Sequence, residues 1–253
     1  MSGGGELVRS YRGRMGSRFA SFTASYLETD LWIGVDPASF SPRIEDFAAS
    51  LARRLRLELD AYIKLRPEFR TSLAPIEDDP EAPRIARAML AASAEAGVGP
   101  MAAVAGAVAE LVGQAIEAEF GCREIAVENG GDLWLRFVEA MDVSVYAGSS
   151  PISERIGVSL APELSPLGLC TSSGTVGPSL SLGRADAAMV ACGGGGAALA
   201  DAWATAVGNV VCEARDIERA LDLAQGRRGI VSVILVKDGH MGIRGRLPLR
   251  LFS

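Results

Sequence analysis

Four short apolar runs follow one another closely after residue 123 and restrict the folds open to this chain: REIAVE, LWLRF, VSVYAG and RIGVSL. Runs rich in β-branched, aromatic and other apolar residues at this spacing are typical of strands in a meander. The chain also contains long helical patterns before and after these runs. Helices inserted among antiparallel strands indicate an α+β fold, with an antiparallel sheet and packed helices, rather than a doubly wound sheet.

Three helical patterns precede the strand runs. SPRIEDFAASLARRLRLELDAYIKL predicts a long amphipathic helix that ends before Pro67, and EAPRIARAMLAASAEAG a second helix that ends at Gly97. A third helix, over residues 99–118, is apolar on nearly all sides and should be buried against the sheet. This stretch is mostly alanine and is interrupted by Pro100 and Glu110, so a core helix is favoured over a membrane span.

The two ends of the chain are predicted to be rich in strands. Two β-rich runs lie within residues 8–36, and GIVSVILVKDGHMGIRG predicts a closing β-hairpin. Another helix is expected over residues 197–209. No linker divides the 253 residues, so we expect a single unit over residues 1–253 with a flexible lead over residues 1–8.

Composition excludes several classes of function. The net charge of −6 argues against a nucleic-acid surface and an anionic membrane patch. The absence of an apolar stretch near the first residue indicates a cytoplasmic protein. The four cysteines form no C-x-x-C pair, which removes the usual zinc and thioredoxin signatures and favours reduced thiols in a core. His240 is the single histidine, which leaves little room for a Ser-His-Asp triad or a multi-histidine metal site.

The first candidate site is the segment Asn129-Gly130-Gly131-Asp132, between two apolar runs. Asn-Gly is typical of a two-residue hairpin turn, because both central positions need positive φ. Paired glycines also allow a backbone to approach a bulky anion, as in phosphate-binding turns. Both interpretations remain open from these residues alone.

The second candidate lies in ALADAWATAVGN. Asp201 and Thr205 are four residues apart and therefore project from one face of a helix. A carboxylate beside a hydroxyl offers hard oxygen ligands of the kind that Mg²⁺ prefers. In the alternative interpretation, Asp201 accepts hydrogen bonds from amides in the first turns of the helix, and Thr205 simply faces the core.

Two further segments of small residues are candidate sites. Gly193 to Gly196 lie between a strand and a helix, where free amides can bind a phosphate or where the loop is a plain connection. The segment matches neither the P-loop nor the dinucleotide fingerprint. The segment from Thr171 to Gly174 offers hydroxyl groups after a strand, either to a ligand or to its own turn, and lacks the G-x-S-x-G pattern of a nucleophile elbow.

Taken in order, GGD after a strand, then TSSG, then ADAWATA resembles the ApbE-like superfamily of flavin transferases. GPMAAVAGAVAE is similar to a branch of short cytosolic bacterial and archaeal proteins within that superfamily. The resemblance covers about residues 97–209. It implies an ApbE-like, T-fold-like architecture, FAD and Mg²⁺ as cofactors, and transfer of FMN through a phosphoester to a threonine or serine of an acceptor protein.

The resemblance also implies site residues. The dinucleotide would lie against Asn129, Gly130, Gly131 and Asp132; Thr171, Ser172, Ser173 and Gly174 would line the flavin pocket; and Asp201 and Thr205 would hold the metal and act as catalytic residues. Two elements of the family pattern differ here. The helix pattern GPMAAVAGAVAE carries no lysine, and the interval TVGPSLSLGRADA carries no histidine-containing hairpin.

Three functions follow from these observations. The first is Mg²⁺-dependent FMN transfer, or related chemistry at a nucleotide pyrophosphate. The second is a non-catalytic module that binds a flavin or another anionic metabolite, which the two departures from the family pattern favour. The third is a structural or homo-oligomeric role, because the small-residue helices fit close packing either within the chain or between copies of it.

Overall fold

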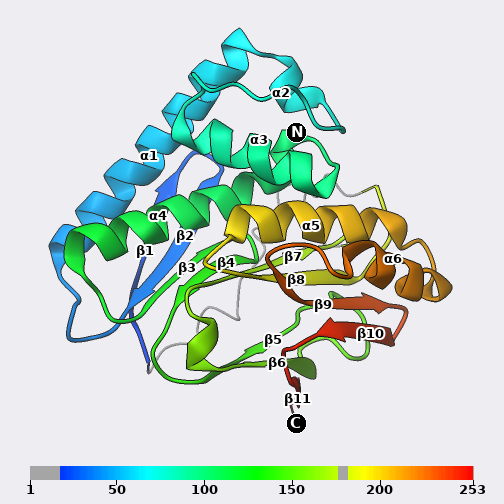
Figure 1. Ribbon diagram of the computed structural model, residues 1–253. Helices are drawn as coiled ribbons and strands as arrows, with labels where there is room; N and C mark the ends of the chain where they lie inside the picture. The colour runs from blue at the N-terminus through cyan, green and yellow to red at the C-terminus, as the bar shows by residue number, and fades with distance from the viewer. Residues whose placement is uncertain (1–17, 176–181, 253) are drawn as a thin grey trace, which may run out of the picture.

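An eight-stranded antiparallel sheet forms the centre of the computed structural model, which describes residues 18–175 and 182–252 (Figure 1). The expected flexible lead over residues 1–8 lies outside the described residues. The strand order is β1-β2-β3-β4-β7-β8-β9-β10. These strands are β1 (Ala20–Tyr26), β2 (Thr29–Val35), β3 (Ile125–Asn129), β4 (Asp132–Arg136), β7 (Leu167–Ser172), β8 (Ala187–Gly193), β9 (Ile230–Lys237) and β10 (His240–Gly245).

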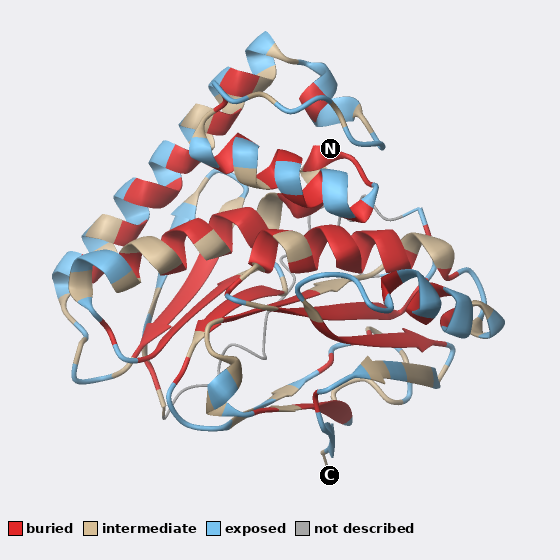
Figure 2. Cartoon of the chain, viewed as in Figure 1, coloured by how far each residue is buried: buried red, intermediate tan, exposed pale blue. Residues whose placement is uncertain are grey.

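Helices cover one face of this sheet (Figure 1). They are α1 (Pro42–Leu65), α2 (Glu68–Thr71), α3 (Arg84–Ala96), α4 (Val104–Phe120), α5 (Ala197–Val210) and α6 (Ile217–Ala224). Three short 3₁₀ turns complete the described helical elements: η2 (Pro100–Ala103), η3 (Pro162–Leu164) and η4 (Ala214–Asp216). The large hydrophobic core lies between the helices and the sheet, where the central strands and most of α5 are buried (Figure 2). The predicted α+β fold, an antiparallel sheet with packed helices, is confirmed.

A small second sheet covers the other face. Its strand order is β11-β6-β5, with β5 (Met141–Ser144), β6 (Ile156–Leu160) and β11 (Leu249–Leu251). A second hydrophobic cluster fills the space between the two sheets. Strand β11 was not predicted from the sequence.

The strand runs after residue 123 therefore do not form one meander, as the sequence suggested, but divide between the two sheets. β3 and β4 are buried along almost their whole length, whereas residues of β5 alternate between intermediate and exposed positions. A strand that is apolar on both faces belongs between two layers, and a strand with one wet face belongs on the outside. The place beside β4 is taken by β7 instead, with Leu133 paired to Leu169.

The predicted apolar helix is confirmed as η2 followed by α4, which ends at Gly121 in the left-handed conformation (φ 63°). The span Pro100–Phe120, with a mean hydropathy of 1.3, is long and apolar enough to cross a membrane by length and composition. It packs instead on the central sheet. Gly113 of α4 lies against the ring of Trp134 on β4, which brings the helix backbone onto the sheet.

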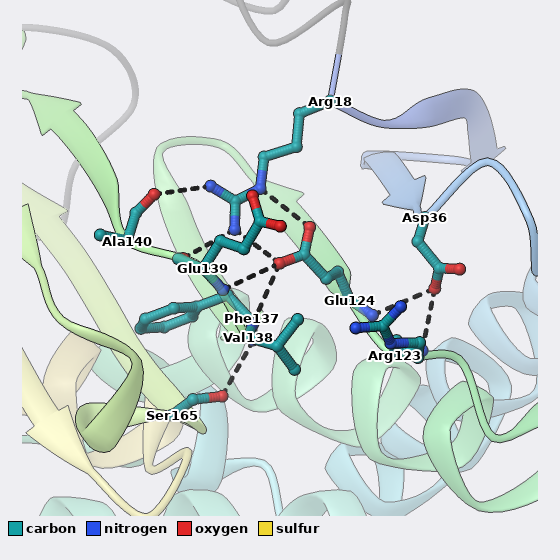
Figure 3. Close-up of polar contacts among 9 residues, drawn as sticks. All are labelled: Arg18, Asp36, Arg123, Glu124, Phe137, Val138, Glu139, Ala140 and Ser165. Carbon is teal, nitrogen blue, oxygen red and sulfur yellow. Dashed lines mark hydrogen bonds and ion pairs between the residues drawn. The ribbon is translucent and has the colours of Figure 1, made fainter.

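The buried carboxylate of Glu124 connects the chain before β1 to the start of β3 and the end of β4 (Figure 3). Glu124 accepts hydrogen bonds from the Arg18 guanidinium, with Nε 2.9 Å from Oε2, and from the amide of Val138 at 3.0 Å. The Arg18 hydrogen bond is the main reason that the pKa of Glu124 is lowered. Beside it, Asp36 accepts the amides of Arg123 and Glu124 at 2.8 and 3.1 Å.

The cysteines depart in part from the expected buried thiols. Cys122, Cys170 and Cys192 are buried and free, as expected, whereas Cys212 is exposed just after α5. Burial raises the pKa of the Cys192 thiol to about 12.

The contact between Gly113 and Trp134 gives a test of the helix–sheet packing. A β-carbon at Gly113 would lie 2.1 Å from Cε3 of Trp134. We expect Gly113→Ala to lower the free energy of unfolding by about 1–3 kcal/mol through overpacking, although the same change in an open helix is stabilising. Urea unfolding measures this effect. In a Trp134→Leu background the cost of Gly113→Ala should shrink, and an increase in stability from Gly113→Ala alone would contradict this contact between α4 and β4.

Candidate functional site

The segment Asn129–Asp132 is a two-residue hairpin turn between β3 and β4. Asn129 pairs with Asp132, and the two central glycines have φ values of 67° and 106°. Only glycine adopts both conformations without strain, which explains the paired glycines of the sequence. The Glu128 carboxylate accepts the amide of Gly131 at 2.7 Å and fixes the turn from within.

This turn lies where three elements meet. The side-chain amide of Asn129 donates to the carbonyl oxygen of Ala105 in the first turn of α4, at 3.2 Å. The Asp132 carboxylate accepts the backbone amide of Thr171 on β7 at 3.1 Å. The turn is therefore held between the N-terminus of α4 and the end of β7, and the structure brings Asn129, Asp132 and Thr171 together.

Asp201 reaches the same place from α5. Its Oδ2 accepts the amide of Gly106, in the first turn of α4, at 2.9 Å. The residue before α4, Ala103, supplies no side-chain cap, so a carboxylate from another helix satisfies an amide that would otherwise lack a partner. In the alternative interpretation of the sequence, Asp201 accepts hydrogen bonds from amides of its own helix. The structure instead places it on amides of α4, a long-range partner that local spacing does not indicate.

Burial sets the electrostatics of this junction. Burial raises the pKa of Asp132 to about 7, and the hydrogen bond from the Thr171 amide partly opposes this rise. Burial also raises the pKa of Asp201 well above its ordinary value, and the neighbouring charge of Asp132 adds to this effect. The Cys170 thiol lies near both carboxylates, and its pKa is raised by burial and then by their charges. Asp132, Asp201 and Cys170 therefore keep their protons to higher pH than the same side chains do in water.

Thr205 follows Asp201 by one turn of α5, and both side chains are buried. Thr205 lines a cavity of about 20 Å³, enough for about one water molecule, between α5, η2 and the chain before α3. The other lining residues are Ser72, Leu73, Val98, Gly99, Met101, Ala102, Leu182 and Asn209. Asn209 stands one turn beyond Thr205, and its Oδ1 accepts the amide of Leu182 at 2.6 Å.

The remaining residues of the TSSG segment serve the connection to β8. Ser172 is the last residue of β7 and pairs with Ala188. The Ser173 hydroxyl accepts the amide of Thr175 at 3.1 Å, and the amide of Gly174 donates to the carbonyl oxygen of Ala185 at 2.9 Å. Within this segment, Thr171 is joined to the junction of the hairpin turn and the helix end, because its backbone amide donates to Asp132.

The glycine run before α5 is engaged by the backbone around it. The amide of Gly193 donates to the carbonyl oxygen of Gly229 at 2.9 Å, and that of Gly195 to Pro166 at 2.8 Å. Gly194 and Gly195 have φ values of 68° and 73°. These contacts favour the interpretation of a plain connection over that of a phosphate-binding loop.

Sequence reasoning missed two residues of the junction. Gly106 allows α4 and α5 to touch, because a β-carbon there would lie 2.2 Å from the carbonyl oxygen of Ala197. Glu110 of α4 accepts the amide of Ala198, in the first turn of α5, at 3.0 Å. The available signal was the charge itself, since Glu110 is the single charged residue in the apolar stretch over residues 98–116. Its partner could not be read from the sequence.

The donors gathered here suit a hard cation better than a soft one. Asp201 and Thr205 offer carboxylate and hydroxyl oxygens on one side of α5. Within residues 18–175 and 182–252, no group of three or more His, Cys, Asp or Glu side chains is arranged to hold a metal ion. Zinc and calcium sites usually need such a group, whereas Mg²⁺ takes one or two carboxylates together with water and phosphate oxygens.

Comparison with known sequences gives a consistent set of relatives. A family model described as "AbpE bacteria" matches residues 12–231. The UPF0280 protein of Methanocella arvoryzae is 42% identical over 195 residues, which cover 77% of this chain and 78% of that protein. The UPF0280 protein of Methanococcus aeolicus is 39% identical over 229 residues, covering 88% and 89%.

Two solved structures with the same fold are flavin transferases. The apo flavinyl transferase ApbE from Pseudomonas stutzeri superposes with a TM-score of 0.53 at 12% identity and covers 89% of this chain and 94% of its own. A mutant of the flavin transferase ApbE from Vibrio cholerae gives a TM-score of 0.56 at 11% identity, covering 89% and 96%. At these identities the likeness establishes the fold.

The raised pKa of Asp132 makes stability depend on pH. In the unfolded chain this acid ionises near its ordinary value of 3.8, and in the folded chain at about 7, so ionisation favours unfolding as pH rises between the two values. We expect Asp132→Asn to raise the free energy of unfolding at neutral and higher pH by up to about 4 kcal/mol, and to change it little near pH 4.

Urea unfolding of both proteins across this pH range, with a chelator present, measures the difference. Asp36→Asn is the control of opposite sign, because backbone and side-chain hydrogen bonds lower the pKa of Asp36 despite its partial burial. Asp36→Asn should therefore lower the free energy of unfolding at neutral pH, and this loss should disappear in acid, where Asp36 is protonated. A gain in stability from Asp132→Asn that is the same at all pH values would rule out the ionisation mechanism.

Proposed function

Because the chain belongs to the family described as "AbpE bacteria" and has the fold of the ApbE flavin transferases, we propose that it binds a flavin nucleotide together with Mg²⁺ and acts on the nucleotide's pyrophosphate. Transfer of FMN from FAD to a hydroxyl of an acceptor protein is the reaction that fits best. We place this activity in the cytoplasm and in a single ApbE-like unit over residues 1–253.

One observation carries the proposal: two buried carboxylates lie close enough for their charges to interact, Asp201 on the N-terminus of α4 and Asp132 on the end of β7. The pKa of each is raised by burial, and the charge of Asp132 raises that of Asp201 further. A divalent cation would relieve this repulsion and compensate the burial of the ionised forms. The donor set thus fits Mg²⁺.

In this proposal Asp201 and Thr205 would hold the cation, and bound Mg²⁺ would neutralise phosphate charge and polarise the leaving group. The Asp201 carboxylate is already oriented, because its Oδ2 accepts the Gly106 amide. The N-terminus of α4, with its partial positive charge, would favour an anionic group nearby. Asn129 and Asp132 would form the wall of the nucleotide site, since the hairpin turn holds them against α4 and β7.

A non-catalytic binding module is the second candidate, and a specific observation favours it. The single histidine, His240, lies in the exposed β9–β10 hairpin, where its Nδ1 is 3.1 Å from the carbonyl oxygen of Asp238. Helix α4 carries no lysine. A protein that keeps the cation site without these groups would bind the nucleotide and leave it intact.

Titration of FAD by calorimetry, with and without Mg²⁺, tests the cation site. We expect Asp201→Ala to weaken Mg²⁺-dependent binding by more than about tenfold, and Asp201→Asn to weaken it as well because it keeps the shape but loses the charge. Thr205→Val should have a smaller effect, since a neutral hydroxyl contributes less than a carboxylate. Asp36→Asn is the matched control, because Asp36 also accepts two backbone amides but lies in another corner of the fold.

Equal affinity in all these proteins, or binding by the wild type that ignores Mg²⁺, would exclude the proposed site. A lost helix cap alone would lower the stability of Asp201→Ala by about 1 kcal/mol and leave affinity unchanged. Release of AMP from FAD then separates the two functions. Transfer or hydrolysis at the pyrophosphate yields AMP, whereas a binding module yields none.

A further inference from the structure

Helices α4 and α5 meet at their N-termini, and each caps the other. In Figure 1 the two helices run in opposite directions away from a shared region of overlap. Asp201 of α5 accepts the amide of Gly106 at 2.9 Å, and Glu110 of α4 accepts the amide of Ala198 at 3.0 Å. Neither helix has a side-chain cap from its own preceding residue. The two hydrogen bonds therefore form a reciprocal pair.

The Glu110 carboxylate is itself held from a third helix. Its Oε1 accepts the side-chain amide of Gln114 at 3.2 Å, and Gln114 accepts the guanidinium of Arg84 on α3 at 2.8 Å. With one oxygen on Gln114 and the other on α5, Glu110 has a defined orientation. The first turn of α5 is thereby fixed relative to α3 and α4 together.

We propose that Glu110 is a positioning residue for the cation site, which keeps the Asp201 carboxylate at the N-terminus of α4 by holding the first turn of α5. This inference rests on the proposed function for its metal, although not for its geometry. Asp201 follows Ala198 by three residues, so the amide that Glu110 holds belongs to the turn that carries the Asp201 backbone.

The close contact at Gly106 makes this placement sensitive. A β-carbon at Gly106 would lie 2.2 Å from the carbonyl oxygen of Ala197 and 2.8 Å from Cβ of Asp201, so the helices already touch through their backbones. Without Glu110 the amide of Ala198 loses its acceptor, and the first turn of α5 must bind water or shift away from α4. Either change would move Asp201 relative to the Gly106 amide.

Two measurements on Glu110→Ala, Glu110→Gln and Leu111→Ala test the proposal. Leu111 is buried next to Glu110, and its truncation lowers stability without removing a polar contact. The first measurement is the affinity for Mg²⁺ alone by calorimetry. We expect Glu110→Ala to weaken it by about 10–100-fold, Glu110→Gln to retain much of it because the amide oxygen still accepts the Ala198 amide, and Leu111→Ala to match the wild type.

The second measurement is hydrogen exchange at the amides of Gly106 and Ala198, without metal. We expect both amides to exchange faster in Glu110→Ala, with Gly106 reporting the displaced Asp201, and neither to respond selectively in Leu111→Ala. Wild-type protection of Gly106 in Glu110→Ala, or equal loss of Mg²⁺ affinity in Leu111→Ala, overturns the positioning role. A wild type that binds no Mg²⁺ while Glu110→Ala exposes Gly106 removes the proposed function but supports the geometry.

Discussion

Two helix N-termini brought side by side repel each other, because each carries the partial positive charge of its free amides. The α4–α5 pair resolves this conflict with two carboxylates. Asp201 of α5 accepts an amide at the N-terminus of α4, and Glu110 of α4 accepts an amide at the N-terminus of α5. The arrangement requires close contact, which Gly106 permits. The rest of the candidate site depends on this pair, since the hairpin turn is hydrogen-bonded to the same end of α4 and also to the end of β7.

Layering explains why the site is where it is. The central sheet is covered by helices on one face and by the small sheet on the other, so its middle strands are buried on both sides. Polar side chains in such strands must find partners inside the protein. Asp132 does so at the start of β4, where the neighbouring strand β7 supplies an amide. Burial then makes its charged form costly, which is a condition typical of functional sites.

The sequence predicted features with local causes and missed those with long-range causes. The turn at Asn129 was predicted because Asn-Gly chemistry is contained in adjacent residues, and the end of α3 at Gly97 was predicted for the same reason. The departure of β5 and β6 into a second sheet depends on which strand occupies the place beside β4, and no local pattern encodes this. Likewise, the spacing of Asp201 and Thr205 indicated a shared helix face, but the partner of Asp201 lies 95 residues away in the chain. The role of Glu110 was hidden by the same separation.

The distribution of thiols makes the native chain suitable for selective chemical labelling. Cys122, Cys170 and Cys192 are buried, and burial raises the pKa of each thiol, so all three stay protonated and shielded from electrophiles at neutral pH. Cys212 is exposed and follows α5 directly. An alkylating fluorophore would therefore attach at the C-terminal end of the helix that carries Asp201 and Thr205. Its emission would report on that helix without any engineered cysteine.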